Sequence, residues 1–436
     1  MTFTDRWGVP VQASSAESVT VLDNAIEDLA ALTGDPVGGA GKAVADDRLV
    51  LARIYQAYLC LYAATPEGVT QARDLLAGLT AEPEREQCHL SAARAWAEGN
   101  WEGATRWLEC ALLANPRDLL ALKVVQDLYF FLGNRLELRD SPARVLRAWP
   151  EGEPGWGYVQ GIYAFGLEEN ADYRQAETRA RAALAVNPKD VWSVHAMAHV
   201  YEMEGSHRPG VEFLTTTAPD WTDSYFAVHN WWHRGLYHLE LLELDEAVRL
   251  YDDQIRKTPS TEWLDVVDAA AMLWRLRLYG VDVTDRARRL AADIDELVSD
   301  PVYIFNDWHA VMTFGLAGDH GRVPRIIAAN RRLTAPTNQR AAQIAGRDLL
   351  EAFAAFVTGD PARTVDLLIG IRQHANTVGG SHAQRDVIDL TLIAAAAQSG
   401  DGRLARALVA ERVARKPSAE ASARHLVTAN GLAAKL

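Results

Sequence analysis

Two pairs of histidines stand close together in the sequence, and the members of each pair are four residues apart. The pairs are His195 with His199 and His229 with His233. This spacing places both side chains of a pair on one face of an α-helix, one turn apart. Glu202, three residues after His199, adds a carboxylate to the same face. Imidazoles and carboxylates bind zinc or iron, and imidazoles also transfer protons near neutral pH. The pattern predicts a histidine site and leaves metal binding and acid–base catalysis both open.

Two further histidines, His309 and His382, are expected near the beginnings of helices. Asp307 precedes His309 and is expected to cap that helix rather than to act in chemistry. Ser381 and Gln384 have the spacing of a capping box, and a cap explains this segment as well as a catalytic role does. The candidate catalytic residues are therefore His195, His199, Glu202, His229, His233, His309, His382, Arg385 and Asp386, of which the last two are alternatively an ordinary ion pair.

Tryptophans lie near these histidines in the sequence, and Trp192, Trp232 and Trp308 are candidates to line a ligand pocket. An aromatic wall with a few polar groups is typical of small-molecule sites, although core packing is the more frequent role of tryptophan. The metal-ligand candidates are His195, His199, His229 and His233, with zinc or iron as the ion. No glutamate follows the first histidine, so the H-E-x-x-H motif is absent from this helix. No motif in the sequence indicates a particular class of reaction.

The helices that must carry these residues belong to a repeating pattern. Three segments align on small residues and prolines, namely Ala104 with Pro116, Ala176 with Pro188, and Ala247 with Pro259. Their prolines are 72 and 71 residues apart, which is two periods of about 35 residues. The pattern resembles the tetratricopeptide repeat, a helix–turn–helix unit of about 34 residues. The resemblance implies an all-α solenoid, a right-handed superhelix of antiparallel helix pairs.

In a tetratricopeptide array the first helix of each repeat lines a concave groove. The resemblance places His195, His199 and Glu202 on the groove side of one first helix. It places His229 and His233 on the matching side of the next first helix. Neighbouring helices are about 8–10 Å apart, so these imidazoles are expected to meet. A groove-lining imidazole buries little area, and we expect its removal to leave the stability almost unchanged, whereas removal of a core histidine would cost about 1–3 kcal/mol.

The repeats predict three consecutive parts of one solenoid. These are N-terminal capping helices in residues 1–84, tetratricopeptide-type repeats in residues 85–260, and degenerate repeats in residues 261–436. Ser14 and Glu17 have capping-box spacing before the first helix. Residues 33–41 are rich in glycine and proline and are predicted to form a loop. No segment shows sustained alternation with a period of two residues, so we predict no sheet.

Several motifs taken together resemble the tetratricopeptide repeat protein 38 family, and the similarity is to a bacterial member over nearly the whole length. The motifs are Gly8–Ser15, His195–Gly205, His229–His233, Tyr251–Asp252, Asp268–Leu276, Phe305–Ala310 and Ser381–Asp386. That family is broadly uncharacterised, so the resemblance implies a fold and candidate residues but no reaction. Trp308 stands where a small residue is expected, which implies a reshaped pocket.

Composition limits the partners. With 44 basic and 58 acidic residues the net charge is −14, which disfavours nucleic acid and anionic membrane surfaces. The three cysteines are too few and too scattered for a disulfide framework. The first residues lack the features of a signal peptide, so a cytoplasmic protein is expected. The predicted function is an enzyme or a protein that binds a small molecule or metal. The alternative is a scaffold whose concave groove holds a peptide or partner protein.

Overall fold

The computed structural model of the chain describes residues 1–298, 300–319 and 321–431. Its contacts divide the chain into two compact units. Unit 1 contains residues 1–197, 217–227 and 335–337, and unit 2 contains the described residues of 198–216, 228–334 and 338–436. Boundaries between the units fall inside helix α11 (Val191–Met203) and near the beginnings of α14 (Ala227–Glu240) and α20 (Pro336–Ala341). The three consecutive parts predicted from the sequence were defined by repeats and not by contacts. The two units therefore do not test them, and they stay a prediction.

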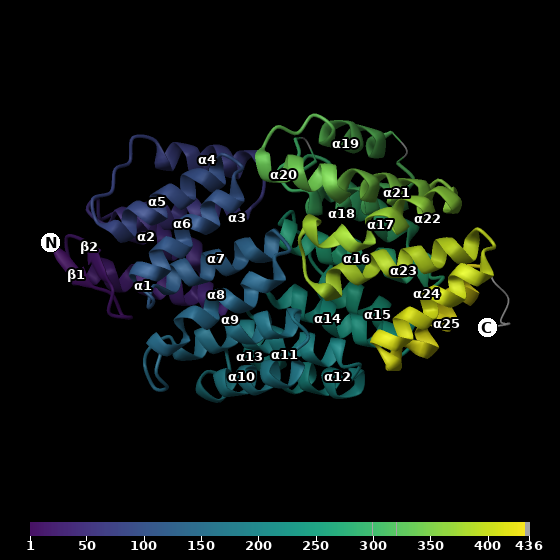
Figure 1. Ribbon diagram of the computed structural model, residues 1–436, viewed down its shortest axis with the longest axis horizontal. Coiled ribbons are helices and arrows are strands. Elements are labelled where there is room, and N and C mark those ends of the chain that lie inside the picture. The colour runs from purple at the N-terminus through teal and green to yellow at the C-terminus, as the bar shows by residue number, and fades with distance from the viewer. Residues whose placement is uncertain (299, 320, 432–436) are drawn as a thin grey trace. The chain divides into compact units, whose positions relative to one another are not determined.

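Unit 1 begins with a small hairpin and continues as helices (Figure 1). Its elements are β1 (Thr2–Thr4), β2 (Pro10–Gln12), α1 (Ala16–Ala31), α2 (Pro36–Ala43), α3 (Val50–Tyr62), α4 (Pro66–Leu76), α5 (Glu84–Ala97), α6 (Trp101–Ala114), α7 (Leu119–Phe131), α8 (Arg135–Val145), α9 (Trp156–Glu169), α10 (Tyr173–Val186) and α13 (Ala218–Trp221).

Unit 2 is built from the remaining helices. They are α12 (His207–Thr216), α14 (Ala227–Glu240), α15 (Leu244–Leu250), α16 (Trp263–Leu278), α17 (Thr284–Asp293), α18 (Ile304–Ala317), α19 (Arg322–Asn330), α20 (Pro336–Ala341), α21 (Arg347–Val357), α22 (Pro361–Ile371), α23 (His382–Gln398), α24 (Gly402–Arg415) and α25 (Glu420–Ala429), with α14 and α20 each beginning at residues assigned to unit 1.

Consecutive helices pack against each other in pairs, such as α5 with α6, α9 with α10, and α21 with α22 (Figure 1). The aligned small residues lie inside this packing, because Ala104, Ala176 and Ala247 have no exposed surface. Two of the repeats also begin alike. Asn100 caps α6 and Asp172 caps α10, each through its side chain. The predicted all-α fold with packed helix pairs is confirmed. None of the described helices is both long enough and apolar enough to cross a lipid bilayer.

The prediction of no sheet is wrong at the N-terminus. Strands β1 and β2 pair antiparallel, with Phe3 opposite Val11. Each strand has three residues, and so short a segment cannot produce an alternation that stands out in the sequence. The hairpin therefore escapes a search based on periodicity.

The predicted loop over residues 33–41 is also wrong, because helix α2 occupies most of it. Asp35 caps this helix, and its side chain accepts a hydrogen bond from the backbone N–H of Gly38. The cap and a proline in the first turn outweigh the low helix propensity of the glycines. The first helix, α1, is capped by Ser15 rather than by Ser14.

A buried network of charges joins the C-terminal helices of unit 2 to α11 and α14. The Lys416 ammonium lies 2.7 Å from Glu202 and 3.4 Å from Glu240. Arg412 forms ion pairs with Glu240 and with Asp386. Burial alone would raise the pKa of Glu240, but the charges of Lys416 and Arg412 outweigh burial and lower that pKa. Each charge in this network is stabilised by its partners rather than by water.

We expect Glu240→Gln to destabilise the protein by about 3–5 kcal/mol, because the substitution leaves two buried cations with fewer partners. The pKa of Glu240 is lowered in the folded state. Its contribution is therefore present above the ordinary glutamate pKa of about 4.3 and is lost as the pH falls through the folded pKa. Urea denaturation at several pH values measures both effects.

The control for this prediction is Glu420→Gln, which removes the exposed ion pair between Glu420 and Arg424. Exposed pairs contribute about 1 kcal/mol or less. Equal losses of stability in the two variants would show that the buried network has no special role.

Candidate functional site

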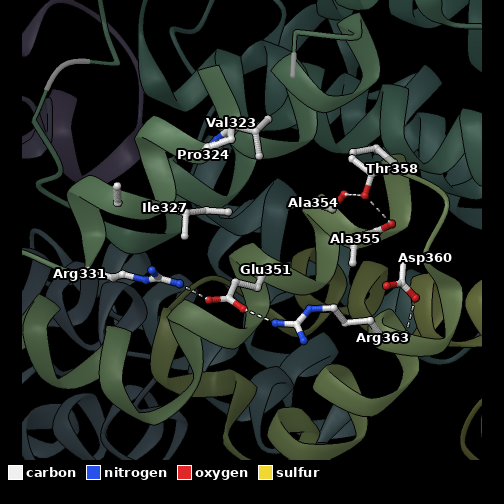
Figure 2. Close-up of a pocket in the computed structure, with 12 residues that line it drawn as sticks. Val323, Pro324, Ile327, Arg331, Glu351, Ala354, Ala355, Thr358, Asp360 and Arg363 are labelled. Carbon is white, nitrogen blue, oxygen red and sulfur yellow. Dashed lines mark hydrogen bonds and ion pairs between the residues drawn. The ribbon is translucent and has the colours of Figure 1, made fainter. Parts of the chain in front are cut away.

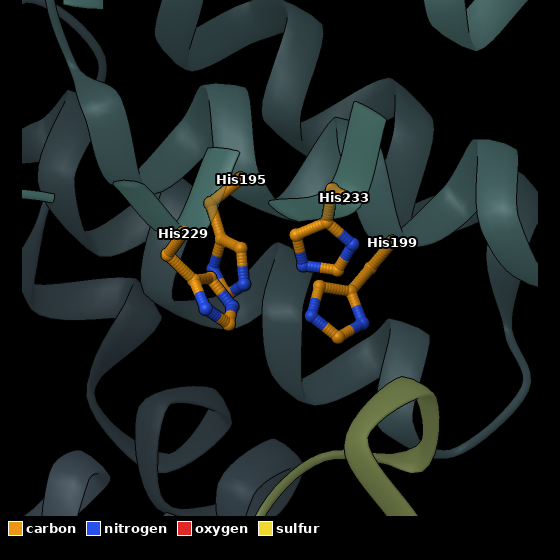
Figure 3. Close-up of side chains that lie close together, drawn as sticks. All are labelled: His195, His199, His229 and His233. Carbon is orange, nitrogen blue, oxygen red and sulfur yellow. The ribbon is translucent and has the colours of Figure 1, made fainter. Parts of the chain in front are cut away.

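The histidine cluster of unit 2 is formed by two helices, α11 and α14. His199 comes from α11, and His229 and His233 come from α14. The ring centroids of His199 and His233 are 4.5 Å apart, and those of His229 and His233 are 4.8 Å apart. Figure 3 shows these imidazoles gathered in one place. The i,i+4 spacing on α14 brings its two rings to one face, as the sequence predicts.

His195 precedes His199 by one turn of the same continuous helix, α11. Within unit 2, one side-chain nitrogen from each of His199, His229 and His233 can be chosen so that all three lie within 4.8 Å of one another. In unit 1, His195 stacks on Phe165 with a centroid distance of 5.4 Å. The expected convergence is therefore observed for the three histidines of unit 2.

Asp268, on α16, holds one of these imidazoles. Nδ1 of His229 lies 2.8 Å from a carboxylate oxygen of Asp268, and Asp268 has no exposed surface. Burial raises the pKa of Asp268, and the nearby His229 opposes that rise. A carboxylate on Nδ1 directs the other nitrogen, Nε2, toward a ligand, as in many metal sites. His229 also stacks on Trp232 at 5.2 Å with an interplanar angle of 19°.

The sequence analysis missed Asp268 as a partner of the cluster. Its only signal was membership of the Asp268–Leu276 motif. A contact between residues 39 positions apart depends on how two helices pack, and spacing within one helix does not reveal it. Knowledge of which helices are neighbours would have been needed to pair Asp268 with His229.

His233 is neutral in this environment. Burial lowers its pKa well below the ordinary histidine value, and the charges of His199, His229 and Arg275 lower it further. A neutral imidazole keeps the lone pair that binds a metal ion or accepts a proton. The electrostatics of the cluster thus favour the chemical form that either predicted role requires.

The expectation that these histidines are lightly buried is wrong. His199 and His233 have no exposed surface, and His229 is 5% exposed. Asp268 and Trp232 cover them from within unit 2. Alanine at these positions therefore removes packed atoms, which favours the alternative expectation of a loss of stability.

Glu202 is directed to the charged network. Its Oε1 accepts a hydrogen bond from Lys416 at 2.7 Å, and the residue is buried. A glutamate bound to a lysine is already neutralised, so Glu202 contributes to the structure of unit 2. Its predicted part in chemistry stays a prediction.

His309, on α18, is a neutral buried imidazole with one nitrogen to spare. Its Nδ1 donates to the carbonyl of Phe305 at 2.8 Å. Its Nε2 has no hydrogen-bond partner within the part of the chain that the structure describes. Burial lowers the pKa of His309 to about 3. An acceptor nitrogen buried in this way is available to a ligand.

Asp307 is not the helix cap that was predicted. Helix α18 begins at Ile304 with Tyr303 at the N-cap position, so Asp307 lies within the first turns. It is buried, and burial raises its pKa to about 7, although a hydrogen bond from Asn330 opposes the rise. The helix begins earlier than expected because the apolar residues before Asp307 also pack in the core.

The C-terminal motif has a structural explanation. Ser381 and Gln384 form the predicted capping box at the start of α23, and His382 is the first residue of this helix. Arg385 donates to the backbone carbonyls of Gly379 and Gly380.

Asp386, from the same motif, pairs with Arg412. An ordinary ion pair between Arg385 and Asp386 was one alternative. The carboxylate instead belongs to the charged network of unit 2.

All three candidate tryptophans are buried. Trp192, in unit 1, packs on Phe165, with a centroid distance of 5.0 Å. Trp232 lies against the histidine cluster, and Trp308 packs edge-on against Phe353 at 5.2 Å. This is the packing role that tryptophan most often has. The lining of a ligand pocket by these residues stays a prediction.

A surface pocket of about 400 Å³ lies elsewhere in unit 2, between α19, α21 and α22 (Figure 2). Its two arginines, Arg331 and Arg363, both pair with Glu351, at 2.8 and 2.7 Å. The pocket contains none of the predicted site residues. Because both of its arginines already pair with a carboxylate of the protein, the histidine cluster is the stronger candidate site. A comparison with protein-family models finds no family that matches the chain.

We expect His233→Ala to destabilise the metal-free protein by about 1–3 kcal/mol, since it leaves a cavity and polar neighbours without a partner. The control is His374→Ala, at an exposed position, where a change of about 0.5 kcal/mol or less is expected. Urea denaturation followed by tryptophan fluorescence compares the two. Wild-type stability in the His233 variant would contradict the observed burial.

Proposed function

We propose that this chain binds a first-row transition-metal ion, zinc or iron, and uses it to act on a small molecule. The ligands are His199, His229 and His233, all in unit 2. The observation that carries the proposal is the gathering of their nitrogens within 4.8 Å. Imidazole suits both metals.

The spread of the nitrogens is close to what a metal ion requires. Zinc binds histidine nitrogen at about 2.0–2.1 Å, so two ligand nitrogens of a tetrahedral site are about 3.4 Å apart. Nitrogens at the observed 4.8 Å limit reach that distance when each ring moves by roughly 0.7 Å. Rotation about side-chain bonds supplies such a movement without any change in the helices.

The coordination number decides between two kinds of site. Three histidines leave a position for water or substrate, as in catalytic zinc sites, whereas four histidines fill a tetrahedral site. Asp268 supports metal binding in either kind of site, because a carboxylate behind a histidine ligand makes that ligand more basic and fixes its orientation. A metal-bound water has a lowered pKa and is a nucleophile near neutral pH.

Acid–base catalysis without a metal is the second use of the same imidazoles. The neutral state of His233 favours acid–base catalysis as much as metal binding. A peptide-binding scaffold was the alternative function, and no observation favours it. A peptide in a groove needs accessible contact residues, whereas the histidines are at most 5% exposed.

We also infer that the helix pairs form a tetratricopeptide-type solenoid and that the chain is related to the tetratricopeptide repeat protein 38 family. The support is the shared spacing of Ala104 and Ala176 from their prolines, with both alanines fully buried. The cysteines are free, which suits the proposed cytoplasmic location.

The direct test is elemental analysis of the protein purified without a metal-affinity tag from medium supplemented with zinc and iron. About one metal ion per chain is expected in the wild type. His199→Ala and His233→Ala should lose it, and His374→Ala should retain it. A metal-free wild type, or full metal content in the His233 variant, would overturn the metal proposal.

The role of Asp268 has a separate test. Asp268→Asn keeps the size of the side chain but weakens the hold on His229, and such substitutions lower metal affinity about 10–100-fold. Competition with a chromophoric zinc chelator measures the affinity. Unchanged affinity would mean that Asp268 serves packing alone.

A further inference from the structure

Arg275, on α16, is a buried cation without a carboxylate partner. It is 2% exposed, and no carboxylate oxygen of the described residues lies within 4 Å of its guanidinium nitrogens. Asp386 and Glu202 influence it through their charges, but they pair with Arg412 and Lys416. Burial lowers the pKa of Arg275 to about 10, so the group is still a cation at neutral pH.

Only neutral groups hold the guanidinium in place. Nη1 donates to the carbonyl of Ala271 at 3.2 Å, and Nη2 donates to the carbonyls of Ala383 and Gln384 at 2.8 and 3.2 Å. The guanidinium carbon lies 5.3 Å from the centroid of the Trp232 ring. Arginine has five N–H donors, so these bonds leave donors for a further partner. Contacts from three helices fix the position of the charge.

This cation lies next to the histidine cluster. The Trp232 ring contacts the guanidinium of Arg275 and also stacks on the ring of His229. The charge of Arg275 also lowers the pKa of both His233 and His309. Asp268 and Arg275 are seven residues apart on α16, so they share a face of the helix about 10 Å apart.

Polar atoms without partners accompany this cation. Within the described residues, Nε1 of Trp232, Nε2 of His309 and both side-chain polar atoms of Asn230 are buried and make no hydrogen bond. Native proteins leave few such atoms, and those of Trp232 and His309 belong to residues that Arg275 contacts or influences through its charge. They lie on α14 and α18, the helices whose histidines respond to Arg275.

An unpaired buried cation is unfavourable, and arginine does not relieve this by losing its proton. An anion that enters beside it removes the cost and gains charge-assisted hydrogen bonds. We propose that Arg275 binds a small oxyanion, so that the substrate of this site carries a carboxylate or a phosphate group. That the anion is part of the substrate of the metal site rests on the proposed function. That Arg275 binds an anion does not. The substrate is small, since Trp232 and His233 have no exposed surface.

The test uses metal-free full-length protein in chloride-free buffer. Thermal shift is measured against inorganic phosphate and, separately, against acetate, so that the two arms distinguish the two oxyanions. At least one anion should raise the melting temperature of the wild type in a saturable way. Arg275→Met should weaken that binding about tenfold or more, and Arg363→Met, in the pocket of Figure 2, should leave it unchanged.

Arg275→Lys covers the case in which Arg275→Met does not fold. It keeps the charge and changes the donor geometry, so weaker but measurable binding is expected. Absence of any anion effect on the wild type, or wild-type affinity in either Arg275 variant, overturns the proposal. Anion binding that depends on Arg275 in a chain that takes up no metal overturns the metal site alone. Metal uptake without an anion response overturns only the anion site.

Discussion

The hydrogen bond between His229 and Asp268 connects two of the helices on which the candidate site depends. It joins α14, which carries two of the clustered histidines, to α16, which carries Arg275. Because the bond is fully buried, it fixes the ring of His229 in one orientation and one tautomer. The neighbouring ring of His233 is then confined between His229 and His199. The positions of the imidazoles are thus set by helix packing and do not depend on a mobile loop.

Unit 2 buries several charged side chains. They fall into two groups that differ in whether the protein supplies an opposite charge. Around Glu240 every ionic group has an opposite charge in contact, so the network is complete within the protein. Around Arg275 the ionic group has only carbonyl oxygens and an aromatic ring. The first arrangement is typical of a structural role, because it leaves nothing for a ligand to satisfy. The second arrangement is typical of a binding site, because its balance is completed from outside.

The sequence predicted the elements of this site better than their surroundings. The four-residue spacing of His229 and His233 states which face of one helix they share, and that is a local property. The pairing of consecutive helices followed from the repeat pattern, and Ala104, one of its aligned small residues, is fully buried. The full burial of His233 did not follow, since burial depends on how helices distant in the sequence pack together. The predicted cap at Asp307 was wrong for a related reason. Core packing of the preceding residues makes the helix begin earlier, at Ile304.

The charged network of unit 2 has a consequence for the order of folding. Lys416 and its partner Glu202 are separated by 214 residues, and Arg412 and Glu240 by 172 residues. During synthesis the two glutamates emerge long before the cations that neutralise them. Contacts of such high sequence separation form late and slow the folding of the domain that needs them. The helices that carry the histidines therefore reach their final packing only after α24 has left the ribosome. Until then, Glu202 and Glu240 favour open conformations in which water solvates them.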